Sequence, residues 1–127
     1  MEIQYAIFCE DVKFPDEPQG KIVMTNPISA RRIKGAGAVK LKMPLFVTFI
    51  KGTKGTDYKL DVKVMGSSGN TIITRDFKFG WPKASLARAE CFVLELPEIN
   101  NSDTLIFSLI LDGVEQHRLK IPVTLLP

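Results

Sequence analysis

Five positively charged residues between positions 31 and 42 are the part of the chain best suited to chemistry, because no acidic residue lies among them. They are Arg31, Arg32, Lys34, Lys40 and Lys42. Two glycines in the same stretch permit positive φ angles, and such a loop could direct backbone N–H groups at an anion. The stretch lacks the Gly-Lys-Ser/Thr ending of a P-loop and the strand-then-helix context of a dinucleotide-binding fold. It therefore predicts a contact with phosphate or nucleic acid, with a solvated loop as the simpler interpretation.

Nucleic-acid binding requires cations for the phosphates and exposed rings for unpaired bases. The net charge of +3 is concentrated in the basic segment. Lys40 and Lys42, however, alternate with apolar residues, as the solvated face of a strand would. The aromatic residues fall mostly on strand positions that are predicted to face the core, namely Phe46, Phe49, Phe77, Phe92 and Phe107. Nucleic acid is therefore the less favoured partner.

Catalytic and metal-binding chemistry finds little support in the residues. His117 is the only histidine, and no serine or cysteine accompanies it in a known catalytic motif. A zinc site needs about four ligands, which two distant cysteines and one histidine do not supply. The connection at residues 10–17 holds four acidic residues and could suit calcium, but a solvated acidic turn is the simpler interpretation. We expect no catalytic residue, no cofactor and no metal site.

The two cysteines, Cys9 and Cys91, are flanked by apolar residues. This setting is typical of buried, reduced thiols rather than of a disulfide framework. The N-terminus has an acid at position 2, no basic segment and an apolar run too short for a signal peptide. Every apolar run is also far shorter than the ~20 residues of a membrane-spanning helix. We expect a cytoplasmic protein.

The elements that would position these residues are β-strands. Residues 58–64 alternate apolar and charged side chains, as in a strand with one buried face. Residues 44–50 and 104–111 are apolar on both faces, which is typical of strands in the middle of a sheet. Asp112-Gly113 predicts a tight hairpin from 104–111 to 116–123. The predicted strands are 3–9, 20–24, 44–50, 58–64, 71–79, 91–97, 104–111 and 118–125.

The fold class follows from the number and spacing of these strands. Residues 83–90 alone show helical periodicity, which predicts one or two turns between strands. Eight short strands without room for crossover helices imply an antiparallel β-sandwich, immunoglobulin-like or C2-like, with at most one short helix. The 127 residues fit one β-sandwich domain over 1–127.

Trp81 lies at a stiff corner between Gly80, which ends a strand, and Pro82, which fixes the backbone after it. Its ring could cap the open end of the sandwich or point outward as an anchor for a protein partner. We predict the capped form, and keep Trp81 as a candidate protein contact if the ring points outward.

An apolar opening stretch leads into Cys9, Asp11 and Val12, and Gly20 and Lys21 begin the next predicted strand. This arrangement resembles a family of small uncharacterised bacterial proteins, in which an opening strand leads into a Cys-x-Asp-Val signature and a Gly-Lys strand follows. The sequence departs from the family pattern at 25–29, where a second glycine and an aromatic residue would be expected. The resemblance implies a bacterial or phage β-sandwich and supplies no catalytic residues.

The predicted function is a non-enzymatic protein-interaction or structural module that contacts another protein or a second copy of itself. The alternative is phosphate or nucleic-acid binding through the basic segment at 31–42. The two hypotheses differ in geometry. One continuous face holding all five cations would favour the alternative, and scattered directions would favour protein interaction.

Overall fold

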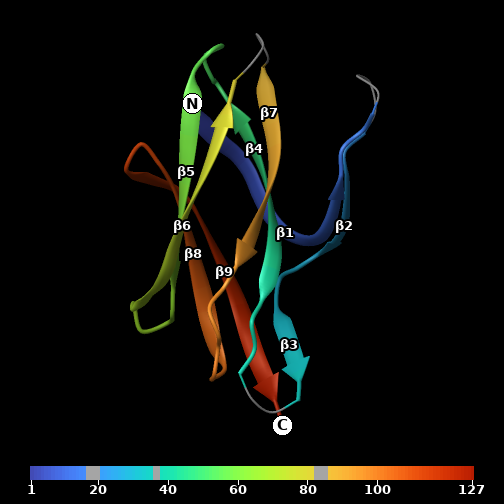
Figure 1. Ribbon diagram of the computed structural model, residues 1–127, viewed down its shortest axis with the longest axis vertical. Helices are drawn as coiled ribbons and strands as arrows, with labels where there is room; N and C mark the ends of the chain where they lie inside the picture. The colour runs from blue at the N-terminus through green and yellow to red at the C-terminus, as the bar shows by residue number, and fades with distance from the viewer. Residues whose placement is uncertain (17–20, 36–37, 82–85) are drawn as a thin grey trace.

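Figure 1 shows the computed structural model, which describes residues 1–16, 21–35, 38–81 and 86–127 as strands and connections. The described residues form nine strands in two sheets and contain no helix. The strands are β1 (Glu2–Lys13), β2 (Val23–Pro27), β3 (Arg31–Lys34), β4 (Lys42–Ile50), β5 (Asp57–Met65), β6 (Thr71–Gly80), β7 (Ala87–Glu95), β8 (Asp103–Leu111) and β9 (Val114–Leu126). The predicted all-β sandwich is confirmed.

The four-stranded sheet has the order β2-β1-β4-β7, and all its neighbours pair antiparallel. The five-stranded sheet has the order β3-β9-β8-β5-β6. Its strands pair antiparallel except for β3, which runs parallel to β9. The strands that are apolar on both faces, β4 and β8, lie inside their sheets, as predicted from the sequence.

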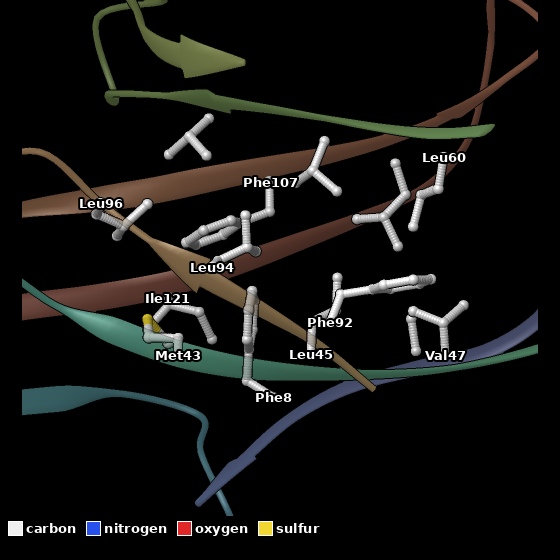
Figure 2. Packing of buried hydrophobic residues seen from close by; sticks show 14 of the residues in the cluster. Phe8, Met43, Leu45, Val47, Leu60, Phe92, Leu94, Leu96, Phe107 and Ile121 are labelled. Atoms are coloured by element: carbon white, nitrogen blue, oxygen red, sulfur yellow. The ribbon is translucent and has the colours of Figure 1, made fainter. Parts of the chain in front are cut away.

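The core lies between the two sheets, where alternate side chains of the strands meet. Figure 2 shows Phe8 and Phe107 from opposite sheets pointing toward one another. Their ring centroids lie 4.6 Å apart in an edge-to-face arrangement, which is the geometry that aromatic pairs prefer. Burying one such side chain fully contributes about 1.5–3 kcal/mol, so the repeated alternation stabilises the stacked sheets.

One part of the four-stranded sheet stands apart from this core. β1 pairs with β4 through its first half and with β2 through its second half, from Cys9 to Lys13. β2 pairs with no other strand, and all five of its residues are exposed. Figure 1 shows this two-stranded ribbon, here called the arm (residues 9–16 and 21–27), projecting away from the other strands.

Three predictions of local structure need correction. Residues 87–90 form the start of β7, so the helical turns predicted for 83–90 are wrong there, and 83–85 lie outside the described residues. The segment Arg31–Lys34, predicted as a loop, is the short strand β3. The predicted strand at 20–24 begins at Val23, within the described part of that range, and continues to Pro27. No helix in the part of the chain that the structure describes is long and apolar enough to cross a membrane.

Candidate functional site

The basic segment becomes strand β3 and the start of β4, and its cations point to different surfaces. Arg31 is in register with Val123, a buried residue of β9, so Arg31 is directed toward the core side of the sheet. Arg32 and Lys34 alternate with it and lie on the outer face of the five-stranded sheet. Residue Gly35 follows with a φ of 112°, which glycine alone adopts without strain.

The remaining two cations of the segment lie near the other sheet. Lys40 follows the isolated bridge between Val39 and Ile99. Lys42 opens β4 opposite Glu95, and their Nζ and Oε1 atoms lie 3.9 Å apart. The five predicted cations therefore do not share one face.

A groove brings Lys40 and Lys42 beside a cation that the sequence analysis missed. It has a volume of about 470 Å³ and is lined by Lys40, Leu41, Lys42, Arg75, Glu95, Leu96 and Pro97. Arg75 is in register with the buried Val62, so it occupies a core-directed position on β6. The sequence signal for Arg75 was a charged residue at a position where the alternation of the strand places apolar side chains. Three cations around one carboxylate could hold a small anion.

Arg32 and Lys34 join further cations on the outer face of the five-stranded sheet, here called the basic face. Its cations are Arg32, Lys34, Lys59, Lys63, Lys78, Arg118 and Lys120. The same face holds four acids, Asp57, Asp61, Asp76 and Glu115. Two cations are paired there, Lys59 with Asp61 at 3.7 Å and Arg118 with Glu115 at 2.9 Å. The net charge of this face is positive, but its charged residues come from four strands, β3, β5, β6 and β9, rather than from one segment.

A polar cluster at the middle of the basic face fixes one of its acids. The Ser108 hydroxyl, which is buried, donates a hydrogen bond to Glu115. Arg118 Nε donates to the same carboxylate at 3.0 Å. The Ser108 hydrogen bond, followed by that of Arg118, holds the pKa of Glu115 below its ordinary value. The lowered pKa keeps the Glu115 carboxylate ionised, and the Arg118 guanidinium 2.9 Å away offsets its charge.

Trp81 is 1% exposed, so the capped form is the one observed and the ring offers no surface to a partner. Its backbone N–H donates to the carbonyl of Thr56, and its carbonyl accepts from the N–H of Gly55. The ring meets Tyr58 edge-on with centroids 6.2 Å apart. A side chain at Gly52 would lie 2.2 Å from the ring, so the glycine makes room for it. Gly52 was not identified from the sequence, because no pattern near it indicates a contact with Trp81, which lies 29 positions later.

Most of the large exposed apolar side chains in the described ranges come from the arm and the four-stranded sheet. Of the eight large exposed hydrophobic residues in the described part of the chain, six lie on the arm or on the outer face of the four-stranded sheet. This apolar surface consists of Tyr5, Phe14, Ile22, Val23, Met24 and Val93. Tyr5 and Phe14 flank Phe46, with ring centroids 6.5 and 6.4 Å from it. Neighbouring exposed apolar side chains, such as Tyr5 and Phe14 around Phe46, mark candidate interaction sites on proteins. The sequence analysis singled out none of these residues as a contact.

Both cysteines are free thiols on the outer side of the four-stranded sheet. Cys9 is 0% exposed and Cys91 is half-buried. Burial is the main cause that raises the pKa of each thiol, and the nearby Asp11 carboxylate adds to both. A thiol with a raised pKa is a poor nucleophile, so this geometry does not activate either cysteine.

The remaining candidates for chemistry do not converge. His117 is in register with the buried Leu109, so it occupies a core-side position on β9 near the hairpin. Within the described ranges, no group of three histidine, cysteine or acidic residues could hold a metal ion. Of the four acids at 10–17, Glu10 accepts a hydrogen bond from Asn26 Nδ2 at 2.8 Å, and Glu17 lies outside the described residues.

No protein-family model matches the chain, and a search of curated proteins finds no similar sequence.

Proposed function

We propose that the protein is a non-enzymatic protein-interaction module that binds its partner through the apolar surface on the arm and the four-stranded sheet. The observation that carries this proposal is that six large hydrophobic residues of the arm and the four-stranded sheet are exposed, with Tyr5 and Phe14 both beside Phe46. Burial of such residues against a partner is favourable, because it removes from water apolar surface that a monomer leaves exposed. The scattered directions of the five predicted cations favour the same hypothesis.

The compartment and origin belong to the same proposal. Both cysteines are free, and buried thiols with raised pKa values suit the reducing cytoplasm. The Cys-x-Asp-Val resemblance supports a bacterial or phage protein. We propose a cytoplasmic interaction module on these grounds.

Affinity purification of tagged variants from the native cell tests this function. Phe14→Ser combined with Val93→Ser removes two apolar side chains from the proposed surface, and Val114→Ser removes one that is 62% exposed at the β8–β9 turn. We expect the double variant to lose proteins that copurify with the wild type and the control to retain them. Equal recovery with both variants would show that the apolar surface is not the binding site.

Binding of a polyanion through the basic face is the second candidate. Lys34, Lys63 and Lys120 have no ion-pair partner among the described residues, and they lie on the same face. The face carries no aromatic side chain for stacking, which favours phosphate contacts over base contacts. Changing the three lysines to glutamine should weaken the retardation of duplex DNA at low salt and flatten its salt dependence. A wild type that retards neither DNA nor RNA would refute this candidate.

A further inference from the structure

The groove beside Lys40 and Lys42 brings together cations from both sheets. Lys40 precedes β4 and Lys42 begins it, whereas Arg75 belongs to β6, an edge strand of the five-stranded sheet. All three residues are exposed and line the same volume of about 470 Å³. Glu95 is the one acid among the described residues that line it, so three cations and one acid give the groove a formal charge of +2.

The backbone along one wall of the groove is held in place by hydrogen bonds. Val39 and Ile99 exchange two of them, of 3.0 and 2.8 Å, and the N–H of Leu96 donates to the carbonyl of Leu41 at 2.9 Å. Leu41 and Leu96 are each 4% exposed and belong to the core. Lys40 therefore lies between two anchored residues. An anion that binds here orders side chains rather than a loop, which lowers the entropic cost of binding.

The charges of the groove are largely unpaired. Lys40 and Arg75 have no ion-pair partner among the described residues. Lys42 and Glu95 form a long contact of 3.9 Å, and their side chains are 69% and 74% exposed. Exposed ion pairs of this kind contribute little to stability, so Lys42 can turn toward another anion at small cost. All three cations are available to a ligand.

Protection of a sheet edge explains only part of this arrangement. A charged side chain directed inward protects an edge strand against pairing with another chain, and Arg75 on β6 fits that role. The role does not explain why Lys40 and Lys42, at the start of a strand in the other sheet, line the same groove. The convergence of the three cations is the observation that indicates a ligand.

We propose that this groove binds the phosphate group of inorganic phosphate or of a phosphate monoester, with Arg75 as the main ligand and Lys40 and Lys42 as supporting cations. A guanidinium donates two parallel hydrogen bonds to a phosphate, whereas lysine acts as a point charge. A phosphate monoester carries a charge of about −1.5 to −2 at pH 7, which matches the formal charge of the groove. None of the described lining residues is aromatic, so the site recognises the phosphate rather than a stacked base.

The two sources of this phosphate differ in what else they place in the groove. The groove is larger than a phosphate ion requires, and Leu96 and Pro97 form part of its lining. Pro97 is half-buried, so its ring offers apolar surface to a substituent on a monoester. Phenyl phosphate, with an apolar substituent, should therefore bind more tightly than inorganic phosphate if the natural ligand is a phosphorylated small molecule. Equal affinity would assign the site to free phosphate.

A nuclear magnetic resonance titration with inorganic phosphate and with phenyl phosphate tests the site. The ionic strength is kept constant with sodium chloride, because exposed charges are screened by salt. We expect the backbone amide signals of Leu41 and Leu96 to shift in a saturable way with both ligands. No saturable shift with either ligand up to about 50 mM, well above a millimolar Kd, would overturn the proposal.

Four variants separate a specific site from general attraction by positive charge. Arg75→Gln should weaken phosphate binding about tenfold or more, and Arg75→Lys should weaken it less, because lysine keeps the charge without the fork. Lys120→Gln makes the same change of charge at an exposed residue of the basic face and should leave binding unchanged. Glu95→Gln removes the one acid of the groove and should tighten binding about two- to fivefold.

The tightening in Glu95→Gln cannot arise from misfolding, and circular dichroism checks that the weakened variants are folded. Equal effects of Arg75→Gln and Lys120→Gln, or weaker binding in Glu95→Gln, would overturn the site. The groove shares no residue with the apolar surface, so its failure leaves the proposed interaction module untouched.

Discussion

Gly52→Ala should destabilise the protein by pressing on the Trp81 ring. A Cβ atom at residue 52 would lie 2.2 Å from two ring carbons and 2.5 Å from a third, so the ring or the loop must move. Because Trp81 is 1% exposed, the ring has no free space to enter. Overpacking of this kind costs about 1–3 kcal/mol, and the loss of glycine entropy in the unfolded chain returns at most about 1 kcal/mol. We expect a net loss of about 2 kcal/mol.

Urea denaturation followed by tryptophan fluorescence measures this effect directly, because Trp81 is the only tryptophan. The folded wild type should emit at short wavelength and resist acrylamide quenching, and Gly52→Ala should shift emission to the red and lower the urea midpoint. Gly80→Ala is the matched control, since its Cβ would approach only the Asp57 carboxylate, at 3.3 Å. An unchanged midpoint and emission spectrum in Gly52→Ala would refute the packing argument.

Two further predictions follow from the pKa values. Cys9 and Cys91 should react slowly with a thiol reagent at pH 8 without denaturant, Cys91 first because it is half-buried; rapid modification of both would contradict their burial. The lowered pKa of Glu115 stabilises the fold above the ordinary value of 4.5, and this stabilisation is lost as the pH falls through the folded-state pKa. Ser108→Ala should therefore lose less stability than the wild type between pH 6 and 3 in urea titrations; an identical loss would show that the hydrogen bond does not set that pKa.

The strands with clear alternation could be predicted from the sequence. In β5, Leu60, Val62 and Val64 are fully buried, as the pattern at 58–64 indicates. β3 could not be predicted, because its four residues obtain their hydrogen bonds from β9, about ninety residues later. The helical pattern at 83–90 was overridden at 87–90, where pairing with β4 supplies backbone partners along the whole strand.

The candidate site was predicted less well than the strands were, because each surface combines side chains from strands that are distant in the sequence. Arg32 and Lys34 were identified, but Lys63 and Lys120, which share their face, lie on strands distant in sequence. Pro122 has no N–H to donate to a neighbouring strand, and prolines in sheets are confined to edges and bulges. β9 lies inside its sheet, yet β3 pairs with it only from Val123 onward, so the side of β9 away from β8 has no partner strand at the proline. The arm was not anticipated, because no local pattern shows that a strand projects from its sheet.

Affinity purification of the Phe14→Ser, Val93→Ser double variant beside the Val114→Ser control tests the proposed interaction surface most directly. We predict that the double variant loses the proteins that copurify with the wild type, whereas the control, whose substitution lies at the β8–β9 turn, retains them. Equal recovery of these proteins with the wild type and both variants would contradict the account.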